Sequence, residues 1–139
     1  MKRRILFVCS GNSARSLIAE ALLRYYGGAF FEVCSAGTDP APVDVRAIRA
    51  LRRCGIPISG LYSKSLKEVS NRYFDLVITL CDKSHKEYVS SPGHGKLASW
   101  DFKDPASRHC FRPFYKTVLE LSTRIKLLVL IYSKAAKVA

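Results

Sequence analysis

The sequence has 139 residues and lacks any long hydrophobic run. Its longest uninterrupted apolar stretch covers residues 127–132, whereas a transmembrane helix needs about 18 apolar residues. A basic start at residues 2–4 is followed by a short apolar run that the polar residues 10–16 interrupt, so we expect no signal peptide. These absences predict a cytoplasmic protein with no membrane partner.

Closely spaced cysteine pairs are also missing. Neither the five cysteines nor the three histidines show the spacing of a metal site, so we expect no metal. In the cytoplasm the thiols are expected to stay reduced rather than form a disulfide framework. The cysteines are Cys9, Cys34, Cys54, Cys81 and Cys110.

Acidic residues are scarce. The chain has 11 Asp and Glu against 23 Lys and Arg, which gives a net charge of +12. None of the common nucleic-acid-binding motifs is present, so we do not expect a nucleic-acid partner. The charge instead predicts a basic surface that attracts acidic partners at long range. One local cluster consists of Arg46, Arg49, Arg52 and Arg53.

Strand-like segments alternate with helical ones along the chain. Alternation of this kind is typical of a parallel sheet with helices on both faces. We therefore predict a single α/β domain, residues 1–139, with a four-stranded parallel sheet flanked by helices on both faces. The predicted strands are residues 5–9, 30–35, 74–80 and 96–100. The predicted helices are residues 15–26, 44–54, 82–89 and 114–132, with a short one that begins at Ser65.

Residues suited to chemistry stand where the predicted strands end. In parallel sheets of this kind, ligands bind beyond the carboxyl ends of the strands. Cys9, Ser35 and Cys81 end the first three predicted strands, and residues 101–105 follow the fourth.

The loop after the first strand has the composition of an anion-binding site. A loop that leads from a strand into a helix turns its backbone N–H groups toward a ligand. Gly11 allows a tight turn, and Arg15 is able to donate to two oxygens of a tetrahedral anion. The predicted substrate-binding residues are Ser10, Gly11, Asn12, Ser13, Ala14 and Ser16.

Cys9 lies at the base of this loop. The amides, the helix dipole and Arg15 favour its thiolate, which is the nucleophilic form. Ser16 is placed to donate a hydrogen bond to the sulfur. A cysteine at the end of a buried strand is also commonly an inert apolar residue. The strand before it, the helix after it, and Gly11 and Asn12 in between favour the catalytic interpretation.

Four segments resemble the low-molecular-weight protein tyrosine phosphatase superfamily, which includes the thioredoxin-coupled arsenate reductases. The resemblance runs over nearly the whole chain and implies the three-layer sandwich of that superfamily. Ala14, the sequence Thr-Leu-Cys-Asp at 79–82 and Asp-Pro-Ala at 104–106 resemble the reductase branch more than the phosphatase branch. The four segments are residues 9–16, 35–38, 74–81 and 100–106.

The resemblance implies a catalytic role for several residues. Cys9 would be the nucleophile, Arg15 would bind the oxyanion, and Asn12 would hold the shape of the loop. Asp104 would be the general acid and then the base that activates water, which agrees with the need to protonate a poor leaving group. An Asp-Pro pair is also common in turns, and Asp101 is the weaker candidate for the acid.

The redox relay of the reductases is incomplete. Cys81 stands where they keep the second thiol, but Tyr88 occupies the position where the resemblance implies a third. One interpretation is a hydrolase resembling protein tyrosine phosphatases, which cleaves phosphotyrosine or a small phosphoester through a thiophosphate on Cys9. Another is an arsenate reductase that uses Cys9, Cys81 and an external thiol from glutathione, thioredoxin or glutaredoxin. The third is a non-catalytic module that binds oxyanions or phosphoproteins.

Further positions depart from the superfamily pattern. Lys64 replaces an acidic residue that helps hold a potassium ion in some reductases, so its ammonium would supply that charge without the ion. Residues 106–107 replace tyrosines that hold aromatic substrates in the phosphatases, which favours a smaller phosphoester or arsenate. Residues 129–131 lie off the apolar stripe of the last helix and predict either packing under a loop or an association surface. We expect a monomer or a weak dimer.

Overall fold

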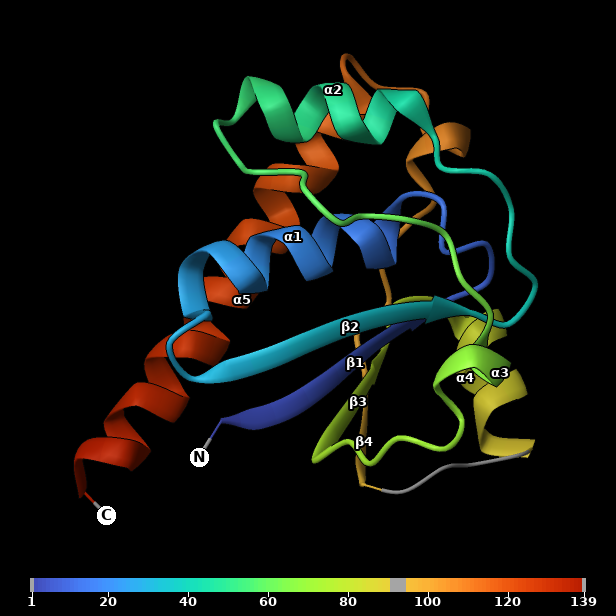
Figure 1. Ribbon diagram of the computed structural model, residues 1–139. Coiled ribbons are helices and arrows are strands. Elements are labelled where there is room, and N and C mark those ends of the chain that lie inside the picture. The colour runs from blue at the N-terminus through green and yellow to red at the C-terminus, as the bar shows by residue number, and fades with distance from the viewer. Residues whose placement is uncertain (1, 91–94, 139) are drawn as a thin grey trace.

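A sheet of four parallel strands forms the centre of the computed structural model, which describes residues 2–90 and 95–138 (Figure 1). The strand order is β2-β1-β3-β4, and every neighbouring pair is parallel. The predicted α/β sheet is thus confirmed. The strands are β1 (Arg3–Cys9), β2 (Phe31–Gly37), β3 (Leu76–Thr79) and β4 (Lys96–Ser99).

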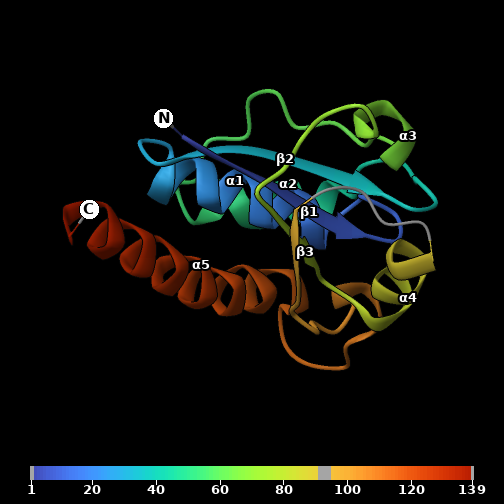
Figure 2. The ribbon, with the colours of Figure 1, turned by 90° about the horizontal axis from the view of Figure 1, so that it is seen from below.

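Helices cover both faces of the sheet, as predicted. Alternate residues of a strand point to opposite faces. Ile5 and Phe7 of β1 therefore pack with α1, α2 and α5, whereas Leu6 and Val8 pack with α3 and α4. Figure 2 shows α5 alongside α1. The helices are α1 (Arg15–Gly27), α2 (Val45–Arg53), α3 (Leu66–Val69), α4 (Asp82–Ser90) and α5 (Pro113–Val138), with a 3-10 turn η1 (Pro105–Ser107).

The end of β2 differs from the prediction by two residues. The strand continues to Gly37 because Cys9 of β1 pairs with it in the parallel ladder. The N–H of Gly37 also donates to the carbonyl of Lys64 at 2.8 Å. β2 therefore pairs with β1 as far as Cys9, where the loop that connects β1 to α1 begins.

The helix α1 ends at Gly27, one residue beyond the predicted end, and the Gly-Gly sequence at 27–28 does not form the left-handed cap that is typical of such a pair. Gly28 keeps a right-handed conformation, with φ at −58°, so no left-handed cap is formed. At Gly27 a Cβ atom would lie 2.8 Å from Val129 Cγ2 and 2.9 Å from Phe31 Cδ2. The glycine is required by the close approach of α5 and β2. Val129 thus packs against α1, whereas Leu130 and Ile131 are largely exposed.

The last helix is longer than predicted. α5 ends at Val138 rather than near residue 132. The predicted apolar stripe does face the core at Phe114, Val118, Leu121 and Ile125. Among the helices of residues 2–90 and 95–138, none combines the length and the apolar character needed to cross a membrane.

The carboxyl ends of the strands gather the predicted functional segments. The loop after β1, the end of β2 and the start of α4 lie together at this edge, whereas both chain termini lie at the opposite edge (Figure 1). The topology therefore places Cys9 and Cys81 at the same end of two adjacent strands.

Candidate active site

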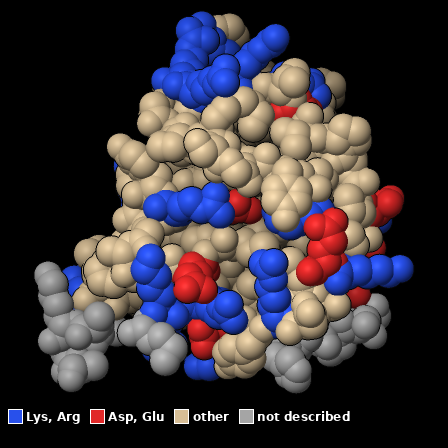
Figure 3. Space-filling view, in the orientation of Figure 1, with Lys and Arg blue, Asp and Glu red and all other residues tan. Residues whose placement is uncertain are grey.

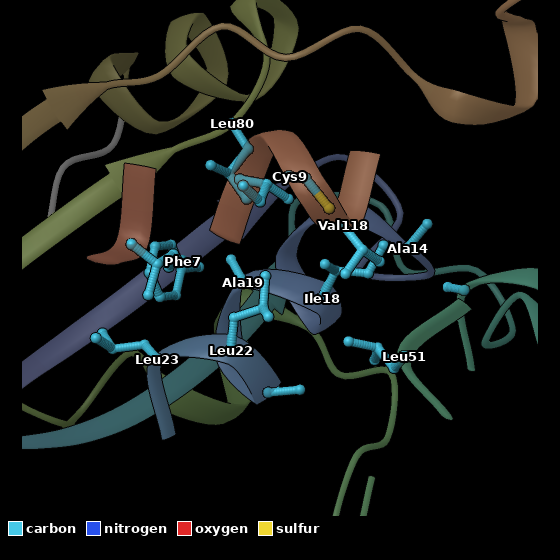
Figure 4. Packing of buried hydrophobic residues seen from close by; sticks show 14 of the residues in the cluster. Phe7, Cys9, Ala14, Ile18, Ala19, Leu22, Leu23, Leu51, Leu80 and Val118 are labelled. Atoms are coloured by element: carbon cyan, nitrogen blue, oxygen red, sulfur yellow. The ribbon is translucent and has the colours of Figure 1, made fainter. Parts of the chain in front are cut away.

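The thiol of Cys9 is buried beneath the loop that it begins. The residue is 2% exposed and closes β1 at the edge of the main core, near Ala14 and Val118 (Figure 4). Its Sγ lies 2.8 Å from Ser16 Oγ and accepts the backbone N–H of Asn12 at 3.2 Å. Two hydrogen-bond donors are therefore within reach of a thiolate at this position.

The side chain of Asn12 fixes the loop. Asn12 is fully buried and has φ at 48°, in the left-handed region that most residues avoid. Its Nδ2 donates to Ser16 Oγ at 2.6 Å and to Ser35 Oγ at 2.9 Å. Its Oδ1 accepts the N–H of Lys64 at 2.8 Å. These three bonds hold the unusual backbone conformation.

The carbonyl groups of the loop face away from Cys9. Those of Ser10, Gly11 and Ser13 accept N–H groups from residues 39, 41 and 44, at 2.8 to 2.9 Å. In a trans peptide the N–H of the next residue points opposite to the carbonyl. The N–H groups of residues 11, 12 and 14 therefore point to the inside of the loop, where an anion would bind.

The N-terminus of α1 completes the anion cradle. Ala14 occupies the N-cap position and provides no side-chain cap, so the first N–H groups of the helix remain available to a ligand. Arg15 begins the helix and donates one guanidinium N–H to the carbonyl of Phe102 at 2.9 Å. A guanidinium has five such donors, so this bond orients Arg15 and leaves other donors for an oxyanion.

Glu20 is a site residue that the sequence reasoning missed. It is 2% exposed on α1, accepts the hydroxyl of Ser35 at 2.6 Å and forms an ion pair with Arg24 at 2.7 Å. Lys64, 5% exposed, places its ammonium 3.6 Å from the same carboxylate. The signal was present in the sequence, since Glu20 is the one charged residue in the apolar stretch 17–23.

Cys81 lies beside the loop. Its Sγ is 3.7 Å from Ser10 Oγ and 3.0 Å from Ser84 Oγ. Burial raises the pKa of the Cys81 thiol, but the hydroxyl and N–H of Ser84, the Ser10 hydroxyl and the charge of Arg15 outweigh burial and hold the pKa below its usual value. Cys81 is thus a more acidic thiol than an ordinary buried cysteine.

The two candidate acids occupy different surroundings. Asp104 is exposed and precedes η1, where its Oδ1 accepts the N–H of Ala106 at 3.0 Å. Its loop is tied to the cradle two residues earlier, through the bond between Phe102 and Arg15. Asp101 lines a separate pocket of about 400 Å³ with Arg108 and Glu120. The bond between Arg15 and Phe102 therefore ties the loop that contains both aspartates to the cradle, and Phe102 also lines the pocket of Asp101.

Residues 4–129 match the family described as low molecular weight phosphotyrosine protein phosphatase. The chain belongs to this family. An arsenate reductase of Brevibacillus brevis is 35% identical over 125 residues, which cover 90% of this chain and 92% of the relative.

Solved structures from both branches of the low-molecular-weight phosphatase family are similar to this fold. A low molecular weight protein tyrosine phosphatase from T. tengcongensis is 31% identical, with a TM-score of 0.79, and the match covers 91% of this chain and 98% of that one. An arginine phosphatase from Geobacillus stearothermophilus is 27% identical with a TM-score of 0.82, covering 96% and 94%. An arsenate reductase from Archaeoglobus fulgidus is 30% identical with a TM-score of 0.74, covering 90% and 98%.

Two of the remaining cysteines, Cys34 and Cys54, are poor candidates for a redox relay. Burial raises the pKa of Cys34 and of Cys54, which disfavours their thiolates. The thiol of Cys34 is directed to the carbonyl of Ser35 at 3.7 Å. Cys110 is half-buried next to Arg108, beyond the loop that contains Asp104.

Gly37→Ala tests whether the close contact between β2 and the loop sets the anion cradle. A Cβ at this position would lie 2.7 Å from Ser10 O and 3.0 Å from Asn12 N, so the loop backbone must shift. We expect phosphate affinity, measured by isothermal titration calorimetry, to fall by about tenfold or more because anion binding depends on donor geometry. Gly55→Ala is the control: φ at 73° makes an alanine strained there as well, but the added Cβ meets no atom and lies at the far end of α2, away from the loop. Equal affinity in both variants would contradict the prediction.

Lys64→Met tests the buried ion pair below the loop. Removing the Lys64 ammonium takes away one of the two cationic partners of the buried Glu20 carboxylate and leaves Arg24 as the other. We therefore expect the free energy of unfolding to fall by about 2 kcal/mol in urea denaturation. Lys67→Met, at an exposed lysine, is the matched control.

Because Lys64 provides the positive charge beside Glu20, we also expect the unmodified protein to need no potassium for activity. Activity that rises several-fold when sodium is exchanged for potassium would contradict this assignment.

Proposed function

We propose that the protein is a cysteine-dependent phosphatase that acts through a thiophosphate intermediate on Cys9. The observation that carries this proposal is the position of the Cys9 sulfur. It lies at the bottom of a loop whose N–H groups point inward, 2.8 Å from Ser16 Oγ and next to an uncapped helix that begins with Arg15. Such an arrangement binds a tetrahedral anion and presents its central atom to a nucleophile. The similarity of this chain to phosphatases of the family also supports the proposed activity.

The first chemical step transfers the phosphoryl group to the enzyme. The Cys9 thiolate attacks phosphorus, so a sulfur–phosphorus bond forms as the bond to the leaving oxygen breaks. The inward N–H groups and Arg15 stabilise the charge on the equatorial oxygens. Asp104 gives its proton to the leaving oxygen, which departs as an alcohol or phenol.

The second step releases phosphate. The Asp104 carboxylate removes a proton from water, and the water oxygen attacks phosphorus. The sulfur–phosphorus bond then breaks and returns the electron pair to Cys9. Ser16 donates a hydrogen bond to the departing sulfur, and this bond is already in place at 2.8 Å. No reductant is needed in either step.

The surroundings of Asp104 support its role as the acid. One carboxylate oxygen, Oδ1, accepts the N–H of Ala106 and is thereby oriented. The other, Oδ2, has no hydrogen-bond partner among residues 2–90 and 95–138, so it is available to hold and release a proton. The anchoring of Phe102 by Arg15 keeps this segment beside the cradle.

Asp104→Asn tests the general acid. We expect hydrolysis of phenyl phosphate to slow by about 10²- to 10⁴-fold, the usual range for a lost general acid. The loss should be smaller for p-nitrophenyl phosphate, because nitrophenolate leaves more readily without a proton. Asp101→Asn is the matched control and should retain activity. A loss under threefold for both esters, or the same loss in both variants, would assign the acid to another residue.

Cys81 favours arsenate reduction as a second candidate function. In that reaction the Cys9 thiolate displaces a hydroxyl group, released as water, from arsenate. The Cys81 thiolate next attacks the sulfur of Cys9, so a disulfide forms and arsenic leaves as arsenite with two electrons. Glutathione or a thioredoxin-type dithiol must then reduce the disulfide. The lowered pKa of Cys81 and its place beside Ser10 suit this second attack.

Tyr88 argues against an internal relay for that reaction. It is 7% exposed and belongs to the core cluster between α4 and the sheet. The segment 82–90 contains no cysteine. An arsenate reductase built on this chain would therefore depend on an external thiol to reach the disulfide between Cys9 and Cys81.

A paired assay on one sample decides between the two activities. We expect hydrolysis of p-nitrophenyl phosphate, and no arsenite from arsenate when thioredoxin or the glutathione–glutaredoxin system is supplied. Cys9→Ser should abolish the hydrolysis but keep phosphate binding. Arsenite production that is lost in Cys81→Ser and kept in Cys54→Ser would instead establish the reductase. Phosphate binding without either activity would indicate a binding module.

A further inference from the structure

A pocket of about 320 Å³ lies between α2 and the start of α5, outside the anion cradle. Its volume is in the range of small ligand sites. Arginine supplies the charge around it, and aromatic rings supply the apolar wall. The residues of interest, here called the arginine pocket, are Arg46, Arg49, Arg53, Arg112, Phe114 and Tyr115.

Most of the positive charge in the arginine pocket is uncompensated. Arg46 is committed to the Asp44 carboxylate through two bonds, at 3.0 and 2.8 Å. Arg49, Arg53 and Arg112 have no acidic partner among residues 2–90 and 95–138. Figure 3 shows basic side chains gathered over α2 and the start of α5, at the top of the view, with few acidic ones among them. An anionic ligand would meet three guanidinium groups here that have no carboxylate partner within the described residues, one of which, Arg112, lies over the Phe111 ring.

The wall of the pocket is apolar and aromatic. The Arg46 guanidinium lies over the Phe114 ring at 4.5 Å, and Pro113 and Tyr115 also line the pocket. Apolar surface next to free charges suits a ligand that has both carboxylates and aliphatic carbon. Acidic side chains of a peptide have both.

The pocket adjoins the proposed active site. The N–H of Asp44 donates to the carbonyl of Ser13 in the loop at 2.9 Å, and α2 begins one residue later. A helix rises about 1.5 Å per residue, so the arginines from Arg46 to Arg53 extend about 10 Å away from the loop. An extended peptide spans that length with about three residues.

We propose that the arginine pocket binds acidic residues that flank the phosphorylated residue of a protein substrate. This inference rests on the proposed phosphatase function and gives it a substrate class. The phosphoryl group enters the cradle above Cys9, and carboxylates about three or more residues from it in the chain reach Arg49 and Arg53. The pocket thus selects among phosphoproteins by local charge.

An acidic peptide fits this pocket better than a nucleic acid does. The free arginines are confined to one helix face and one loop, and the aromatic residues lie within a concave pocket instead of on a flat stacking surface. The link through Asp44 and Ser13 also places the pocket next to a site that acts on a covalently attached group.

Binding of an unphosphorylated peptide tests the pocket without catalysis. The probe is a fluorescein-labelled peptide with three consecutive Glu, compared with its Gln counterpart by fluorescence anisotropy. The double variant Arg49→Gln/Arg53→Gln should bind the Glu peptide about tenfold more weakly, because it loses two carboxylate contacts. The control Arg52→Gln/Lys67→Gln removes the same charge from exposed residues outside the pocket and should bind as the unmodified protein does. If both double variants lose the same affinity for the Glu peptide, long-range attraction by the net charge explains the binding, and the proposal is overturned.

Kinetics then test the link to the cradle. The ratio of kcat/KM for phosphotyrosine peptides with Glu or Gln neighbours should be about ten in the unmodified protein and in the control. It should approach one in Arg49→Gln/Arg53→Gln, with unchanged turnover of p-nitrophenyl phosphate. A ratio of one throughout, or displacement of the Glu peptide by single-stranded DNA of equal charge at a tenfold lower concentration, would overturn the proposal. Absence of any ester turnover would refute the phosphatase function, while the anisotropy result would still decide whether the pocket binds acidic peptides.

Discussion

The site depends on one backbone constraint, the reversal of the loop above the Cys9 sulfur. That reversal requires Asn12 to adopt φ at 48°, a conformation that most residues other than glycine and asparagine avoid. Three buried hydrogen bonds from the Asn12 side chain hold it there, to Ser16, Ser35 and the N–H of Lys64. A glycine at position 12 would reach the same φ without strain but would provide none of these bonds. The short amide side chain supplies both the permitted conformation and the anchor.

The anchor continues into a chain of polar groups beneath the loop. It runs from Cys9 through Ser16, Asn12 and Ser35 to Glu20, with contacts of 2.6 to 2.9 Å. A buried network of this kind is stable only when each member is satisfied. The carboxylate at its end is therefore compensated by Arg24 and by the ammonium of Lys64. The geometry of the loop and the hydrogen bond between Ser16 and Cys9 thus depend on the same compensated carboxylate, Glu20.

Local patterns in the sequence were sufficient to predict the sheet, the loop and the start of α1 at Arg15. Apolar runs and small residues at a strand end are local signals, and the structure places them as predicted. The partners of those residues were not predictable, because they join segments far apart in the chain. The bond from Arg15 to the Phe102 carbonyl involves a backbone atom that every residue has. The approach of Cys81 to Ser10 depends on the register of β3 with β1, which no local pattern specifies.

Phosphate-ester hydrolysis and arsenate reduction would share their first step at Cys9, and they diverge in what must reach the site next. Hydrolysis requires water, which is small enough to enter beside the exposed Asp104. Reduction requires a bulky thiol to attack a disulfide between two sulfurs whose residues are 2% and 8% exposed. With Tyr88 in the core, no cysteine of segment 82–90 carries that disulfide to the surface. The two reactions use the same cysteine and differ in the molecule that must reach it next. Because water reaches a buried sulfur more easily than an external thiol does, this site supports hydrolysis best.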